Sequence, residues 1–138
     1  MKILYKIIMI TAALTVITAN TVYAQSPDQI VETAISRGDA QQLEERMNSN
    51  VQLRIQGADN IYSKEQSRQI LARFFSNNRV ARFAVTHRTL RDGVESIDGT
   101  LFTNGGKYSV YLLLKNGDDT NSSTTYLIHQ IRIENGND

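Results

Sequence analysis

The feature that most constrains this chain is a run of four long segments between residues 82 and 134 in which apolar and polar side chains alternate. They read RFAVTHRTL, ESIDGTLFT, KYSVYLLLK and TTYLIHQIRIE. A period of two is typical of β-strands, because successive side chains point to opposite faces. Asp92-Gly93 and Asn104-Gly105-Gly106 separate the first three segments, and these residue types accept the positive φ of tight hairpin turns. The pattern therefore predicts an antiparallel sheet.

The residues before this run carry the start signals of three helices. Ser26-Pro27-Asp28-Gln29 and Ser63-Lys64-Glu65-Gln66 have the spacing of a capping box, and Asp39 is placed to cap a short helix between them. A fifth strand is expected at VQLRIQ, residues 51–56. This order predicts an α+β fold in which three helices of the N-terminal half pack on the concave face of a curved antiparallel sheet. Such a sheet tends to enclose a conical pocket.

The first 24 residues have the form of a secretory signal peptide. Lys2 and Lys6 precede an apolar stretch over residues 7–19, and Val22 and Ala24 supply small side chains before an expected cleavage. The alternative is an uncleaved membrane anchor, which needs about 20 apolar residues; this stretch is shorter and contains threonines. Cleavage leaves residues 25–138 as a single domain with 13 basic and 14 acidic residues.

The composition then limits where the protein is expected to be located and which classes of partner it is expected to bind. An exported domain without a net positive charge or a basic tail is not expected to bind nucleic acid. The chain contains no cysteine, so it has no disulfide and, in a bacterium, no attachment point for the lipid of a lipoprotein. We therefore expect a soluble protein in the periplasm or outside the cell, with no membrane contact after signal cleavage.

The order of elements, together with NIYSKEQ, IDGTLFTNGGKYSVYLLLK and YLIHQIRIE, resembles a family of small exported bacterial proteins described as domain of unknown function 4783. The resemblance covers residues 28–134. It implies the nuclear-transport-factor-2-like (NTF2-like), cystatin-like superfold. That superfold includes isomerases, dehydratases, ligand binders and dimerisation modules, and the family has no assigned catalytic residues. The resemblance therefore implies a fold and leaves the function open.

The only two histidines, His87 and His129, are the candidates for catalysis. Simple alternation places His129 on one face with Leu127, Ile131 and Ile133. An imidazole there is either a general base for proton transfer or a core residue with one hydrogen bond satisfied.

The face that His87 occupies depends on the register of the hairpin around Asp92-Gly93. A simple two-residue turn places His87 opposite Asp98. A bulge or longer loop near residues 90–95 instead brings His87 to the concave face, because a slip of one residue exchanges the faces of a strand. We favour the bulge, since it groups Phe83 and Val85 with Ile97 and Leu101.

A small apolar ligand in the cone would then contact Tyr62, Phe74, His87, Tyr108 and His129. From Ile97 onward, the strands place no acid on the concave face. Isomerases and dehydratases of the superfold resemble one another in holding a carboxylate, or a His-Asp pair, on that face. This counts against an enzyme. We expect neither a metal nor a cofactor, because two histidines on separate strands lack the ligand spacing of a zinc site.

The segment KYSVYLLLK is apolar on both of its faces. Val110, Leu112 and Leu114 point one way, while Tyr111 and Leu113 point the other way. Because helices can cover only one face, the second face predicts an interaction surface. We expect a homodimer through this surface, with Tyr111, Leu113 and Ile128 at the interface.

Three functions follow from these observations. The first is an exported, non-enzymatic module that binds a small ligand in the cone, dimerises through the sheet face, or both. The second is an isomerase or dehydratase that uses His87 and His129 for proton transfer. The third is a purely structural dimer with a filled cone.

Overall fold

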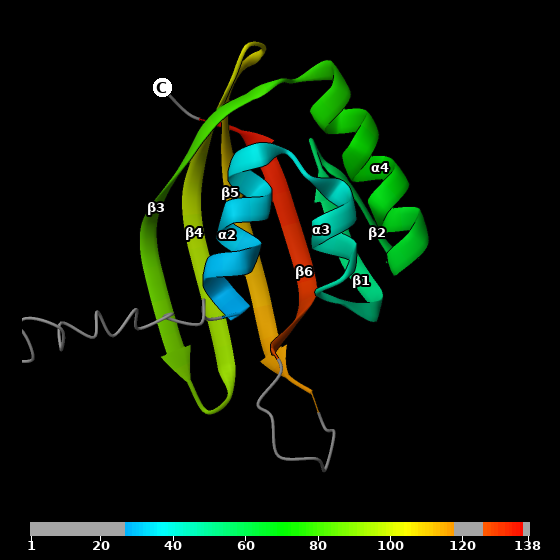
Figure 1. Cartoon of the computed structure of the whole chain (residues 1–138), viewed down its shortest axis with the longest axis vertical. Helices are drawn as coiled ribbons and strands as arrows, with labels where there is room; N and C mark the ends of the chain where they lie inside the picture. Colours follow the sequence, from blue (N-terminus) through cyan, green and yellow to red (C-terminus); the bar gives the residue numbers. More distant parts are fainter. Residues whose placement is uncertain (1–26, 118–125, 137–138) are drawn as a thin grey trace, which may run out of the picture.

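The computed structural model of the chain describes residues 27–117 and 126–136. Three helices lie on one face of a six-stranded sheet (Figure 1). The helices are α2 (Pro27–Arg37), α3 (Ala40–Glu44) and α4 (Lys64–Asn77). The strands are β1 (Met47–Ile55), β2 (Ala58–Ser63), β3 (Val80–Arg91), β4 (Val94–Thr103), β5 (Gly106–Asn116) and β6 (Tyr126–Asn135). The predicted signal peptide (residues 1–24) and the Ser26 cap lie outside the described residues.

The predicted α+β architecture is confirmed, with two differences in the sheet. The strand order is β2-β1-β6-β5-β4-β3, and β1 pairs with β6 in parallel, so the sheet is mixed. The second difference is β2, which forms a hairpin with β1 through Gln56 and Gly57, at φ 49° and 87°. Its residues Asp59 and Asn60 are weak strand formers, which is why the alternation pattern does not reveal this edge strand.

Local signals explain where the helices begin. The Asp39 side chain accepts a hydrogen bond from the Gln42 backbone N–H at 3.0 Å, which caps α3. At the start of α4, Ser63 and Gln66 form the predicted capping box. Gly38, at φ 61°, makes the sharp turn from α2 into α3. Within the described ranges, no helix combines the length and the hydropathy that a membrane span requires.

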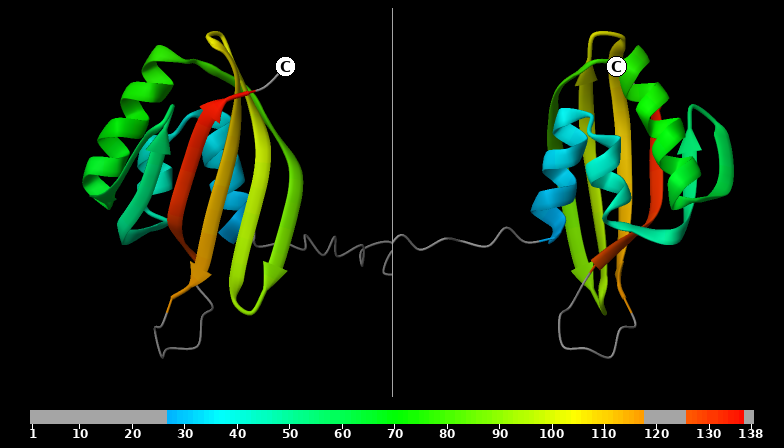
Figure 2. Two further views of the ribbon diagram at one scale, coloured as in Figure 1. Left: turned by 180° about the vertical axis from the view of Figure 1, so that it is seen from behind. Right: turned by 45° about the vertical axis from the view of Figure 1, so that its right-hand side comes forward.

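The hydrophobic core lies between the helices and the concave face of the sheet. The fully buried side chains come from every layer: Val31, Ala34 and Ile35 of α2, Leu43 of α3, Leu71 of α4, Val51 of β1, and the inward side chains of β4, β5 and β6. Seen from behind, the same sheet carries no helix on its other face (Figure 2). We call this uncovered side the open face.

Candidate functional site

Side chains occupy the space that the sequence predicts as a conical pocket. The Phe74 ring makes edge-to-face contacts with Phe75 and Tyr108, at centroid distances of 5.7 and 5.1 Å. The Tyr108 hydroxyl donates a hydrogen bond to Asn78 Oδ1 at 2.9 Å, and Tyr62 packs partly buried against the same core. Three of the five residues predicted to contact a ligand, Tyr62, Phe74 and Tyr108, therefore take part in core packing.

His87 does not reach this core. It lies opposite Asp98 of β4 and is exposed, which is the register of a two-residue turn. The turn residues Asp92 and Gly93 have φ values of 51° and 73°, as a two-residue hairpin turn requires. The preferred placement of His87 on the concave face, through a bulge near residues 90–95, is wrong.

A bulge does occur in β3, but at Thr86, between the pairs Val85–Gly99 and His87–Asp98. The extra residue exchanges the faces of the strand at that point. Phe83 and Val85 consequently pack against the core, as their apolar character indicates, while His87 stays on the open face.

A second bulge displaces His129 from the face predicted for it. Leu114 pairs with Ile128 and Leu113 pairs with Gln130, so His129 is the extra residue of β6. Ile128 and Ile131 are both fully buried in the core, whereas His129 is only partly buried. Simple alternation is therefore wrong here. Burial lowers the pKa of His129 below its ordinary 6.5, and the positive charge of Lys115 lowers this pKa further.

The two histidines do not form a joint site. His87 lies on β3 and His129 on β6, with β4 and β5 between them. Three steps between strands correspond to about 14 Å, at about 4.8 Å per step. Direct proton transfer through one substrate atom needs hydrogen-bond distances from both groups, so this separation is too large.

The open face is a mixture of apolar and charged side chains. The guanidinium of Arg82 lies 3.7 Å from the centroid of the Phe102 ring, and that of Arg132 lies 5.0 Å from the centroid of Tyr111. Leu113 lies beside Tyr111 on β5, partly buried. Ile128 is 0% exposed and belongs to the core, so its predicted place at a dimer interface is wrong.

An acid lies on the concave side after all. Glu95 of β4 is 7% exposed, and its Oε1 is 3.8 Å from Nε of Arg88. The other end of the same guanidinium, Nη2, lies 2.6 Å from Oε2 of Glu32 on α2. The alternation of side chains along β4 places Glu95 on the same face as Ile97, so this acid could have been identified from the sequence. The prediction missed it because it considered β4 only from Ile97 onward.

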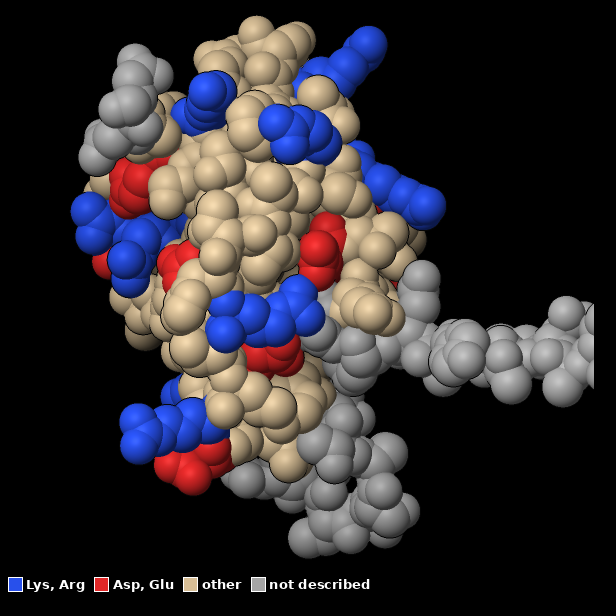
Figure 3. All heavy atoms as spheres, turned by 90° about the vertical axis from the view of Figure 1, so that its left-hand side faces the viewer, with Lys and Arg blue, Asp and Glu red and all other residues tan. Residues whose placement is uncertain are grey.

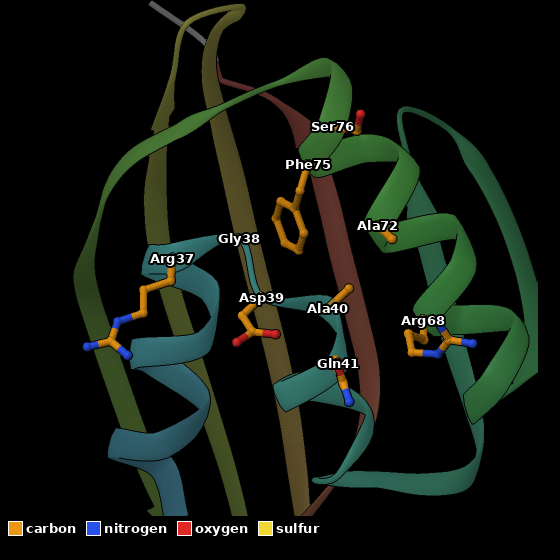
Figure 4. Close-up of a pocket in the computed structure, with 9 residues that line it drawn as sticks. All are labelled: Arg37, Gly38, Asp39, Ala40, Gln41, Arg68, Ala72, Phe75 and Ser76. Atoms are coloured by element: carbon orange, nitrogen blue, oxygen red, sulfur yellow. The ribbon is translucent and has the colours of Figure 1, made fainter.

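The helical side of the molecule carries two open depressions. The larger one, about 500 Å³, lies between the α2–α3 turn and α4. Figure 4 shows the Phe75 ring beside Gly38, with Ala40 and Ala72 lining the gap and Arg37 pointing away. Its polar groups already have roles in the fold, because Asp39 caps α3 and Arg68 forms an ion pair with Glu44.

The second depression, which we call the α2–β3 groove, has a volume of about 420 Å³. Its lining consists of four polar side chains of α2 and one aromatic ring of β3: Gln29, Glu32, Thr33, Ser36 and Phe83. The groove thus lies beside the Glu32–Arg88 ion pair and outside the filled cone.

The charges around the β3 edge do not form a surface of one sign. In Figure 3, which looks onto this side, red and blue side chains alternate over the middle and lower parts. Among the described residues, no group of three or more His, Cys, Asp or Glu side chains is placed to hold a metal ion.

Comparison with known proteins places the chain at the level of family and fold. Residues 28–134 match the family described as domain of unknown function, DUF4783. A DUF4783 protein of Bacteroides ovatus is 36% identical, with a TM-score of 0.73 over 79% of this chain and 94% of that one. A DUF4783 protein of Bacteroides uniformis is 30% identical, with a TM-score of 0.73 over 80% of this chain and 97% of that one.

More distant structures share the fold alone. A domain of unknown function with a cystatin-like fold from Nostoc punctiforme is 9% identical, with a TM-score of 0.62 over 81% of this chain and 74% of that one. Proteins named for NTF2 are also similar in structure. No curated protein matches the chain. The filled cone, the helix-covered sheet and the match over residues 28–134 lead to one conclusion: the chain belongs to the DUF4783 family and has its NTF2-like, cystatin-like α+β fold.

Proposed function

We propose that this protein is a non-enzymatic interaction module that forms a homodimer through the open face of its sheet. The side chains at the centre of the open face support this proposal. Tyr111 and Leu113 of β5 lie there, partly buried, between strands that carry opposite charges beside them. Aromatic and arginine side chains of this kind are enriched at protein interfaces.

Charge complementarity favours a second copy as the partner. Across the sheet, Tyr111 is flanked by Asp98 on β4 and by Arg132 on β6. Two open faces can meet about a twofold axis that runs along β5. Asp98 of each chain then faces Arg132 of the partner subunit, and the two Tyr111 rings meet at the axis.

Catalysis by the two histidines and ligand binding in the cone have less support. Isomerase or dehydratase chemistry with His87 and His129 requires one shared cavity, whereas the two residues lie three strands apart. A small apolar ligand in the cone would have to displace Phe74 and Tyr108, which are 7% and 6% exposed. Export through the predicted signal peptide belongs to the same proposal, and an intact mass that begins at Gln25 would support it.

The test is the mass of the protein in solution at micromolar concentration, measured by sedimentation velocity. A chain that begins at Gln25 is suitable, because every buried core side chain lies between Val31 and Ile133. We expect twice the chain mass. A strict monomer over this concentration range contradicts the proposal.

Two matched substitutions locate the interface. Leu113→Lys places a charge at the centre of the open face, and we expect it to give a monomer. Ile61→Lys makes the same kind of change on the same face, at an apolar side chain that is 68% exposed on the edge strand β2. An axis along β5 leaves the position opposite Ile61 beyond β3, so this variant should remain a dimer. A dimeric Leu113→Lys variant together with a monomeric Ile61→Lys variant would place the interface elsewhere.

A further inference from the structure

The α2–β3 groove has the size of a small-molecule site. Its volume of about 420 Å³ lies within the range of about 300–1,000 Å³ that is usual for ligand pockets. One wall is helix α2 and the floor is formed by β3. Neither the mouth of the groove nor its walls take part in the proposed dimer, since helices and open face lie on opposite sides of the sheet (Figure 2).

Phe83 is the aromatic residue that lines the groove, and its ring lies close to Gly99, where a side chain is absent. A Cβ placed on Gly99 would lie 2.6 Å from Cζ of Phe83, far inside normal contact distance. The ring therefore comes close to β4 at Gly99, and the Phe83 side chain stays partly exposed where it lines the groove.

The wall is a polar stripe along α2. Gln29, Glu32, Thr33 and Ser36 follow one another at the spacing of a single helix face. Two of these groups are held in place. The Glu32 carboxylate accepts a 2.6 Å bond from Arg88, and the Ser36 hydroxyl donates to the Thr33 carbonyl oxygen at 2.7 Å. An amide, a carboxylate and two hydroxyls thus line the groove together with one aromatic ring.

This combination matches the surface of a sugar ring. A pyranose has an apolar C–H face that stacks on an aromatic side chain and a rim of hydroxyls that both donate and accept hydrogen bonds. A charged ligand fits less well, because Arg88 already balances the Glu32 carboxylate and the described residues that line the groove include no lysine or arginine. We propose that the α2–β3 groove binds a neutral saccharide, with one ring stacked on Phe83 and its hydroxyls bonded to the polar stripe of α2.

The experiment is a titration of the isotope-labelled protein with cellobiose and with maltose, followed by amide NMR. We expect saturable shifts at the amides of residues 29–36 and 83–84, with a Kd of about 1–10 mM, as a shallow open groove allows. If neither disaccharide produces saturable shifts at these amides up to about 50 mM, roughly five times the largest expected Kd, the proposal is overturned. Tetramethylammonium serves as the competing probe: tighter binding of this cation at the same amides would overturn it too.

Three variants separate a stacked sugar from a general surface effect. Thr33→Ala removes a hydroxyl from the stripe without touching the core, and Phe83→Leu removes the aromatic floor; each should weaken binding at least about fivefold. Gln41→Ala changes the other depression, between α3 and α4, and should leave the Kd unchanged. If all three variants bind the disaccharides with the affinity of the unmodified protein, the proposal is contradicted. This holds even if Phe83→Leu lowers stability, because Thr33→Ala leaves the core intact.

Discussion

Gly99 shows at the scale of one residue how a missing side chain positions a neighbouring ring. A Cβ at this position conflicts with the Phe83 ring and lies 2.7 Å from the carbonyl oxygen of Ala84. The backbone contact cannot relax by a simple rotamer change. We therefore expect Gly99→Ala to lower the free energy of unfolding by about 3 kcal/mol, measured by urea denaturation.

The neighbouring residue provides the control for this prediction. Thr100 lies on the open face, and Thr100→Ala should change stability by no more than about 0.5 kcal/mol. Equal stability of Gly99→Ala and the unmodified protein would show that β4 and Phe83 can move apart at little cost.

His129 provides a pH-dependent contribution to stability. Burial first, and the Lys115 charge second, lower its pKa in the folded protein below 6.5. The unfolded chain therefore binds a proton more readily, so the free energy of unfolding falls as the pH drops through 6.5 and levels off below the folded pKa. Denaturation midpoints between pH 5 and 8 should show this loss, and His129→Gln should reduce it.

A second variant identifies the cause of the His129 shift. Lys115→Met removes the positive charge but not the burial, so the NMR titration midpoint of the His129 ring should rise yet remain below 6.5. If the His129 ring of the unmodified protein titrates at or above 6.5, this result contradicts the partly buried position that the bulge gives to His129.

Both histidines also show why sequence alternation failed at single residues. A two-residue turn at Asp92-Gly93 places His87 opposite Asp98, which is the alternative that we do not favour from the sequence, and apolar character places Phe83 on the core. The two requirements conflict unless a bulge lies between these positions, and the bulge is at Thr86. Nothing in the type of residue marks Thr86 or His129 as extra, because the position of a bulge is decided by packing on both flanks.

At the scale of elements, Arg88 links α2 to the sheet. Its guanidinium contacts Glu32 of the helix and the buried Glu95 of β4. Arg88→Leu would leave the Glu95 carboxylate with less compensation in a buried place. We expect a loss of about 2 kcal/mol in unfolding free energy and faster amide exchange in α2 than in α4.

Arg91→Leu is the matched control, because Arg91 lies on the same strand and is exposed. It should change stability by no more than about 0.5 kcal/mol. If both variants lose the same stability, the effect comes from the charge of β3 and not from the contacts of Arg88.

The elements differ in how far the sequence predicts them. Helix starts are predictable because Asp39 and Ser63 form their caps with residues three positions away. The parallel pairing of β1 with β6 is not, because the two strands are far apart in the chain and the alternation of each is the same in either direction. The same limit applies to the candidate site: Phe83 and Glu32 are recognisable as residues, but only the packed fold brings them to one groove.

At the scale of the whole molecule, the decisive fact is that all three helices lie on one side of the sheet (Figure 2). The hydrophobic core lies on this helix-covered side of the sheet. The other side is free to evolve as a surface, and there Asp98 and Arg132 lie one strand to either side of Tyr111. In the dimer that we propose, a twofold axis along β5 makes each of these charges the partner of the other across the interface.

Charge reversal tests this geometry. Asp98→Arg and Arg132→Asp each place like charges in contact across the axis, twice per dimer, and each should raise the dimer dissociation constant at least about tenfold in sedimentation experiments. The double variant exchanges the two charges, so by symmetry both contacts are restored, and its dissociation constant should return to within about threefold of the original.

Arg68 and Glu44 serve as the control pair, because they form an ion pair within one chain on the helical side, away from the open face. Exchanging these two charges keeps the pair and leaves the axis untouched, so the dissociation constant should not change. A double Asp98→Arg/Arg132→Asp variant as weak as its single variants would mean that the two charges do not meet across the axis. The dimer would then need a different orientation, even if Leu113→Lys still abolished it.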